Sequence, residues 1–200
     1  MRPANLQQRE ARRQALLDAA ARCFAESGFV ATRTADICLQ AEMSAGNLFH
    51  YFSNKQALLL ALISREGQQI EQAMAELLLE ADPLAALLAF FEHVCQLAQD
   101  PQYTGLALEI AALSHRDPQV AQQVRHNDWL LRQGLAALVQ RANQQGQIHS
   151  ALGTEQIAGW LAALIDGLFT RVAVDPEFHP AHQVQVLQQL VLHLLQGHST

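Results

Sequence analysis

The chain has 200 residues, of which half are apolar and 16% are charged, so its composition excludes a disordered or collagen-like protein and predicts one or two domains with a buried core. Its formal net charge of −6 argues against binding to a polyanion, but the charge is uneven. Residues 1–66 carry eight basic and six acidic residues (+2), whereas residues 67–200 carry five and thirteen (−8), so the first third is the part expected to meet an anionic partner.

The spacing of apolar residues predicts an all-α protein. Apolar residues recur at intervals of three to four along nearly the whole chain, and no segment shows the strict alternation of a half-buried strand. We expect about nine helices, at residues 8–27, 34–41, 45–51, 54–80, 83–98, 101–114, 118–144, 155–173 and 181–196.

Four Asp-Pro pairs mark helix ends. Asp suits the capping position before a helix and Pro suits its first residue, so the pairs at 82–83, 100–101 and 117–118 are expected to open helices. The pair at 175–176 is expected to close one, because Pro176, Phe178 and Pro180 leave only a short irregular stretch before the last helix.

The first three predicted helices are short and joined by tight turns. The first buries an apolar stripe that includes Leu16, Ala20 and Phe24, and it ends at Gly28, which tolerates a left-handed turn, so that Phe29 packs back onto it. Thr34 and Ser44 are expected to cap the second and third helices. The segment therefore reads as helix, tight turn, helix.

The third helix, AGNLFHYF, has one apolar and one polar face. Leu48 and Phe52 lie four residues apart and are expected to anchor it, while Gly46, Asn47, His50 and Tyr51 project on the other side. Hydrogen-bonding groups on an exposed helix face suit the major groove of DNA. Residues 53–56 are expected to form a capping box for the next helix, with Lys55 beside a phosphate-binding N-terminus.

These residues resemble the helix-turn-helix domain of TetR-family transcriptional regulators. The pattern that carries the resemblance is Ala20, Phe24, Gly28, Phe29, Thr34, Ile37, Ala41, Ser44, Leu48, Tyr51, Phe52, Lys55, Leu58 and Leu59. The resemblance implies phosphate contacts from Thr34, Tyr51 and Lys55. It also implies a recognition surface at the start of the third helix, so that the expected DNA-binding set is Thr34, Ser44, Ala45, Gly46, Asn47, His50, Tyr51 and Lys55.

Two residues depart from the family pattern. Glu42 stands at the turn where the family usually has Gly, so a positive φ is expected there, and Phe49 stands where Tyr is common. The alternative is that residues 1–53 form a plain three-helix bundle with a solvated basic edge. Whether Arg9, Arg12 and Arg13 contact phosphates or are merely solvated is left open by the sequence.

The last two predicted helices carry more apolar surface than one core requires. Small residues every four positions allow another helix to approach closely, and in TetR-like proteins the last two helices of each subunit build a four-helix dimer interface. The stretch 157–176 resembles this region in the branch of choline-responsive repressors. The expected interface is Gly159, Ala163, Gly167, Val184, Leu187, Val191 and Leu194. A homodimer reads successive major grooves of a palindromic operator in double-stranded DNA.

The resemblance implies a DNA-binding domain at 1–53 and a ligand-binding and dimerisation domain at 54–200. A small-molecule effector of unknown identity would shift helix 54–80 and release a repressor from its operator. Residues that line its site, or that are simply core, are Met74, Phe90, Phe91, His93, Tyr103, His126, Trp129, Trp160, Asp166 and Phe169. Asp166 is expected either to bind a cationic ligand or to join a hydrogen-bond network at the dimer contact.

Other classes of function receive less support. Cys23, Cys38 and Cys95 are odd in number and widely spaced, which predicts buried thiols in a cytoplasmic protein rather than disulfides or a redox sensor. His179 and His182 lack further ligands for a metal, and no motif of an enzyme or of a cofactor site is present.

The N-terminus lacks a signal sequence, and no apolar run is long enough to span a membrane. A helical adaptor that binds protein instead of DNA remains an alternative.

Overall fold

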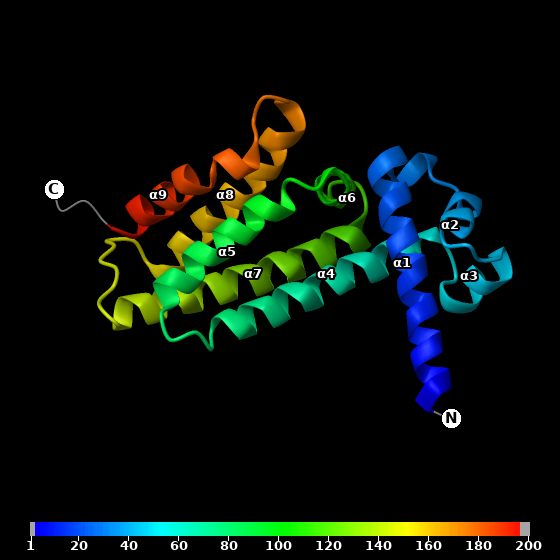
Figure 1. Cartoon of the computed structure of the whole chain (residues 1–200), viewed down its shortest axis with the longest axis horizontal. Coiled ribbons are helices and arrows are strands. Elements are labelled where there is room, and N and C mark those ends of the chain that lie inside the picture. The colour runs from blue at the N-terminus through cyan, green and yellow to red at the C-terminus, as the bar shows by residue number, and fades with distance from the viewer. Residues whose placement is uncertain (1–2, 197–200) are drawn as a thin grey trace. The chain divides into compact units, whose positions relative to one another are not determined.

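The computed structural model describes residues 3–196, and in this range the chain is built from helices (Figure 1). They are α1 (Pro3–Ala31), α2 (Thr34–Gln40), α3 (Ala45–Tyr51), α4 (Lys55–Leu77), α5 (Pro83–Leu97), α6 (Pro101–Ser114), α7 (Pro118–Gln144), α8 (Thr154–Val174), a short 3-10 helix (Pro180–His182) and α9 (Val184–Leu195). The only β pairing among the described residues is a single bridge between His149 and Gln196. The all-α prediction is confirmed, and most helix ends agree with it to within a few residues.

The chain divides into two compact units. One, the head, runs up to Arg65 and includes residues 105–124; the other, the body, comprises residues 66–104 and those from Arg125 onward. This division differs from the boundary predicted at residues 53 and 54. The turn there is only the start of α4, and α4, α6 and α7 each continue without a break from one unit into the other.

The Asp-Pro pairs act as predicted. Pro83, Pro101 and Pro118 each open a helix, and the preceding Asp accepts backbone N–H groups of the first turn; for example, the Asp82 carboxylate accepts the Ala85 N–H at 3.0 Å. The pair at 175–176 closes α8, with Asp175 as its C-terminal capping residue.

In the head, α2 packs against α1, and α3 packs against α2 (Figure 1). The core of this unit contains Phe24 of α1, Ile37 of α2 and Leu48 of α3, all fully buried. Gly28 has a φ of 73° and breaks the helical path of α1, as predicted, and the ring of Phe29 then packs edge-on against Phe24 with centroids 5.3 Å apart.

Helix α6 packs closely against the end of α1. Gly105 allows this approach, because a Cβ there would lie 3.1 Å from the Ala25 carbonyl oxygen. One turn further along α6, the Glu109 carboxylate accepts the Phe29 N–H at 2.6 Å. The break at Gly28 takes this N–H out of the regular helical pattern, so a carboxylate from α6 supplies the acceptor.

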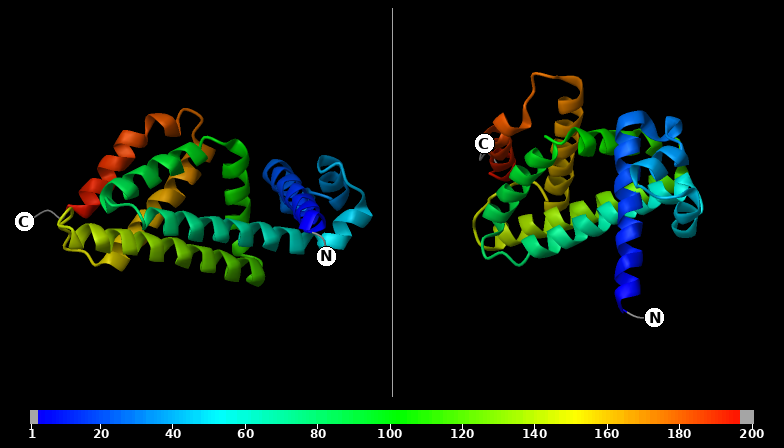
Figure 2. Two further views of the ribbon diagram at one scale, coloured as in Figure 1. Left: turned by 60° about the horizontal axis from the view of Figure 1, so that its bottom comes forward. Right: turned by 45° about the vertical axis from the view of Figure 1, so that its right-hand side comes forward.

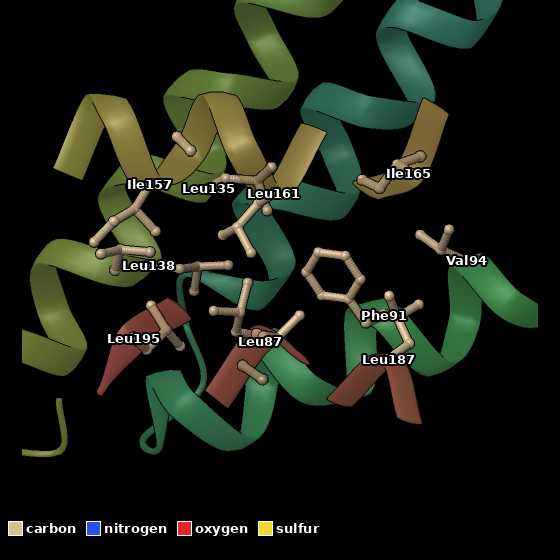
Figure 3. Packing of buried hydrophobic residues seen from close by; sticks show 14 of the residues in the cluster. Leu87, Phe91, Val94, Leu135, Leu138, Ile157, Leu161, Ile165, Leu187 and Leu195 are labelled. Atoms are coloured by element: carbon tan, nitrogen blue, oxygen red, sulfur yellow. The ribbon is translucent and has the colours of Figure 1, made fainter. Parts of the chain in front are cut away.

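The body has its own apolar core. In it α4 and α7 lie side by side and run in the same direction, with α5, α8 and α9 along one side of the pair (Figures 1 and 2). Side chains from four helices meet in the centre, as Figure 3 shows for Phe91 of α5, Leu135 of α7, Leu161 of α8 and Leu187 of α9. Burial of this surface is the main stabilising contribution in the unit.

Candidate nucleic-acid interface

The second helix of the head begins at Thr34, as predicted, but the residue before it is the cap. Arg33 is its capping residue, and its N–H is bonded at 2.9 Å to the carboxylate of Asp36. Thr34 is the first helical residue and is half-buried, so the prediction that its hydroxyl caps the helix was wrong. The Asp36 carboxylate three positions on takes over the capping of this terminus.

The turn between α2 and α3 has the geometry that the sequence predicted. Glu42 has a φ of 54°, the only positive φ of a non-glycine residue in the described chain. The Met43 N–H donates to the Cys38 carbonyl and the Glu42 N–H to the Leu39 carbonyl, at 2.9 and 3.1 Å. These two bonds form a Schellman motif, which requires a left-handed residue at the position that Glu42 occupies.

Helix α3 presents a polar face to solvent. Ser44 caps it as predicted, accepting the Asn47 N–H at 3.3 Å. Leu48 and Phe52 are buried in the head. Asn47 and His50 are exposed, as are the small residues before them, Ala45 and Gly46. An exposed amide and an exposed imidazole on one short helix form a hydrogen-bonding surface.

The aromatic residues of α3 border this surface. Phe49 is 52% exposed, and Tyr51 is half-buried with its ring edge-on to His50, their centroids 5.2 Å apart. The two rings therefore lie side by side at the end of the exposed surface of α3.

Lys55 takes part in the fold of the head in a way that the sequence did not reveal. Its ammonium donates to the carbonyl oxygens of Phe29, Val30 and Thr32 at 2.5, 3.2 and 2.7 Å, and it lies 4.6 Å from the centroid of the Phe29 ring. An ammonium has three donors, and all three are used. In this structure the ammonium closes the end of α1, a role that the predicted phosphate contact did not include.

The predicted capping box at residues 53–56 is also different. Asn54 alone caps α4, its side-chain oxygen accepting the Ala57 N–H at 2.8 Å. Gln56 instead donates to the Asp117 carboxylate at 2.7 Å, within the same unit. The sequence has the spacing of a capping box, but in the fold the Gln56 side chain is bonded to Asp117 and not to the backbone at the start of α4.

The predicted effector-site residues fall into different environments. Met74 and Phe91 are core; Phe90, Tyr103 and Phe169 are half-buried; His93, His126, Trp129, Trp160 and Asp166 are exposed. The structure brings some of them together in pairs: Phe90 with Phe91, Tyr103 with Phe169, and His126 stacked on Trp129. A hollow of about 540 Å³ in the body is lined by a different set, which includes Phe178, His179 and His182.

One acidic group near Tyr103 was missed by the sequence analysis. Glu66 of α4 accepts the Tyr103 hydroxyl at 3.3 Å, and the Tyr103 ring packs on Phe169 with centroids 5.6 Å apart. Burial raises the pKa of the Glu66 carboxyl, and this effect is larger than the lowering caused by the hydrogen bond from Tyr103. Burial also raises the pKa of the Tyr103 hydroxyl. No ion pair among the described residues neutralises Glu66.

Asp166 is an exposed residue of α8. Partial burial raises the pKa of its carboxyl, and the negative charge of Asp128 on α7 raises it further. The described residues contain no group of three or more His, Cys, Asp or Glu side chains suited to a metal ion. Burial raises the pKa of all three cysteine thiols, which disfavours the reactive thiolate.

The predicted dimer-interface residues also divide. On α8, Ala163 and Gly167 are exposed and Gly159 is half-buried; a Cβ at either glycine would meet nothing within 4 Å. On α9, Leu187 and Val191 are buried in the chain's own core, so placing them at the interface was wrong. Val184 and Leu194 are half-buried against that core. The apolar residues that α9 exposes are Val186 and Leu190, at 51% and 50%.

Helix α8 is unusually apolar for a helix with an exposed face. It is long and apolar enough to cross a membrane by length and composition, and 28% of its most apolar stretch is buried within the chain. Its exposed residues include Trp160 and Val174, at 59% and 65%. We call the apolar and small residues that α8 and α9 expose the outer face: Trp160, Ala163, Gly167, Val174, Val186 and Leu190. Exposed apolar surface is typical of protein interfaces.

Comparison with known proteins identifies both parts of the chain. Residues 16–62 match bacterial regulatory proteins of the tetR family, and residues 83–196 match the C-terminal domain of BetI-type transcriptional repressors. The HTH-type transcriptional regulator UidR of Escherichia coli K12 is 26% identical over 180 residues, which is 90% of either chain.

Solved structures share the fold. Salmonella enterica GusR superposes with a TM-score of 0.77 at 28% identity, over 92% of this chain and 95% of its own. A protein from Saccharomonospora viridis, solved in complex with choline, gives a TM-score of 0.78 at 24% identity, over 90% of this chain and 95% of its own.

The role of Lys55 can be separated from phosphate binding by substitution. We expect Lys55→Met to lower the free energy of unfolding by about 2–4 kcal/mol, because three charge-assisted hydrogen bonds are lost. The slope of log DNA affinity against log salt should not change, whereas loss of one phosphate contact from each subunit of a dimer would reduce it by about two. Urea unfolding and salt titration measure the two effects. Arg33→Met, at an exposed cation of the head, is the control for stability; an unchanged stability of Lys55→Met would contradict the assignment.

Proposed function

Because the chain belongs to the TetR family of bacterial regulatory proteins and carries a BetI-type repressor domain, we propose that it is a homodimeric repressor which a small-molecule effector releases from a palindromic operator. Membership makes it a DNA-binding transcriptional regulator and not an enzyme, as the sequence predicted. A regulator of this kind is intracellular, and we place it in the cytoplasm.

The observation that carries the DNA-reading role is the orientation of α3. Its apolar side chains are buried in the head, and Asn47 and His50 are exposed. We propose that Ala45, Gly46, Asn47 and His50 face base edges, with the Asn47 amide pairing with an adenine through two hydrogen bonds. Tyr51 then reaches a thymine methyl or a phosphate, and Thr34 and Ser44 contact the backbone.

The proposed dimer uses the outer face of α8 and α9. Ala163 and Gly167 form a shallow strip along which a second helix can approach, and Val186 and Leu190 extend the apolar surface. A C2 dimer buries the same face on both subunits. It also sets two copies of α3 at a fixed separation, which a palindrome with half-sites about 34 Å apart requires.

We place the effector site beside Glu66 and Tyr103. Burial disfavours the charged form of Glu66, and no ion pair in the described chain neutralises that charge. Such a carboxylate is suited to a ligand with a positive charge. Tyr103 and Phe169 add aromatic faces, which attract cations. The Saccharomonospora viridis protein of the same fold was solved with choline, an organic cation. An organic cation is therefore the effector class that we propose for this chain.

Release follows from the helices that run through both units. Helix α4 carries Lys55 in the head and Glu66 in the body, and α6 carries Glu109 in the head and Tyr103 in the body. A ligand held by Glu66 and Tyr103 acts on the same two helices that hold the end of α1. A preference of about 1–3 kcal/mol for the non-binding conformation changes operator affinity by 5- to 150-fold.

The dimer contact can be tested at Ala163. We expect Ala163→Arg to convert the protein to a monomer at micromolar concentration, because a guanidinium would be buried against an apolar partner helix. Sedimentation velocity measures the change, and Ala75→Arg, at an exposed alanine of α4, is the matched control. A dimer that survives Ala163→Arg unchanged would show that α8 is not at the interface.

The effector class can be tested at Glu66 with choline as the probe. We expect millimolar choline to raise the Tm of the wild-type protein, because it binds only the folded state, and to leave the Tm of Glu66→Gln unchanged. Without ligand, Glu66→Gln should be more stable at neutral pH. The raised pKa means that the wild type loses stability as pH rises through the folded-state pKa of Glu66, and the variant should lack this loss. No response of the wild type to choline or other quaternary amines would refute the cation class, without affecting DNA binding.

A further inference from the structure

The N-terminal part of α1 is a charged helix that adds no side chain to the core of its own unit. We define residues 6–13 as the arm. The first fully buried side chain of α1 is Leu16, and every residue from Leu6 to Arg12 is exposed. Figure 1 shows this part of α1 continuing beyond the segment against which α2 packs. The arm contributes no apolar face to the core of the head.

Positive charge gathers on one side of the arm. Arg9, Arg12 and Arg13 lie within about 100° of one another around the helix axis, given 3.6 residues per turn. Glu10 lies beside them and uses its carboxylate within the arm region, where it accepts the Arg13 guanidinium at 3.3 Å and the Gln14 amide at 2.7 Å. With three arginines and one glutamate, the arm carries a net charge of +2.

The neighbouring side of α1 is where contacts within the head are made. Arg65 of α4 donates to Gln14 at 3.2 Å and pairs with Asp18 at 2.6 Å. Arg9 and Arg12 lie outside this stripe and make no hydrogen bond or ion pair with any residue that the structure describes. Their charges are therefore available to an external anion.

The arm lies next to the recognition helix. The Arg13 guanidinium is 5.6 Å from the centroid of the Phe52 ring, and Phe52 is the C-terminal capping residue of α3. Arg9 falls on the same side of α1, one turn further out. The basic side of the arm thus starts at the C-terminal end of the helix that presents Asn47 and His50, and continues outward from it.

We propose that the arm is a second DNA-binding element, in which Arg9 and Arg12 contact the phosphate backbone flanking each half-site. Guanidinium groups bind phosphate oxygens through paired hydrogen bonds, and a row of cations one helical turn apart matches a polyanion rather than a single carboxylate. The contact is independent of base sequence, so it adds affinity without changing which operator is chosen. The inference rests on the proposed function, since it needs α3 to be docked on DNA.

The test compares two duplexes and two charge-matched variants. The wild-type protein first selects a duplex from a random-sequence library. One test duplex is trimmed to the two half-sites, and the other is extended by about six base pairs at each end, which adds flanking phosphates. One variant is R9A/R12A. The control is R116A/R125A, which removes the same charge from two other exposed positions.

We expect the wild type and R116A/R125A to bind the extended duplex more tightly than the trimmed one, and R9A/R12A to bind both equally. Because a dimer has two arms, R9A/R12A removes four phosphate contacts, and on the extended duplex its salt slope should be smaller by about 3.6. Its loss of affinity between 50 and 200 mM salt should then be about 150-fold less than that of the wild type. The Tm of R9A/R12A should equal that of the wild type.

Three results would overturn the inference. A wild-type protein indifferent to the flanks, or an R9A/R12A variant with an unchanged salt slope, would place the arm away from DNA. Altered self-association of R9A/R12A without DNA would assign the arm to a second copy of the chain, whose body is acidic. Failure of the wild type to select any duplex would contradict the proposed function itself, which distinguishes that failure from a failure of the arm alone.

Discussion

The head depends on how the end of α1 is closed. Gly28 breaks the helix, and the backbone groups that follow are left outside its regular hydrogen-bond pattern. Two charged side chains supply the missing hydrogen-bond partners. Lys55 of α4 donates to three carbonyl oxygens, and Glu109 of α6 accepts the Phe29 N–H. The orientation of α2 and α3 follows from this turn, because the chain leaves it directly into α2. The same helices, α4 and α6, continue into the body. In the proposed function, this turn is where a change in either helix would reach the surface of α3.

Local rules were sufficient to predict most of the fold. The Asp-Pro pairs predicted where α5, α6 and α7 begin and where α8 ends, because both residues act on the backbone beside them. The positive φ of Glu42 was predicted from the resemblance instead, because Glu42 stands where the family usually has Gly. The faces of α3 followed from the four-residue spacing of Leu48 and Phe52.

Long-range contacts were not predictable from the sequence. Lys55 was expected to bind phosphate, since nothing near it in the sequence shows that its ammonium reaches carbonyls some 25 residues earlier. Glu66 stands in a polar stretch and resembles a solvated residue until α6 brings Tyr103 beside it. On α9, periodicity showed a broad apolar face but not how it is shared between the core and the exterior, so Leu187 and Val191 were assigned to the wrong side. In each of these cases the partner of the side chain depends on how the helices pack, which the local sequence does not show.

The central claim is that two copies of α3 read DNA at a separation fixed by the dimer. Hydroxyl-radical footprinting of the wild-type protein on a selected duplex tests it most directly. The account predicts two protected segments related by two-fold symmetry, with centres about 10 base pairs apart on one face of the duplex. A single protected segment, or protection without symmetry, would contradict it.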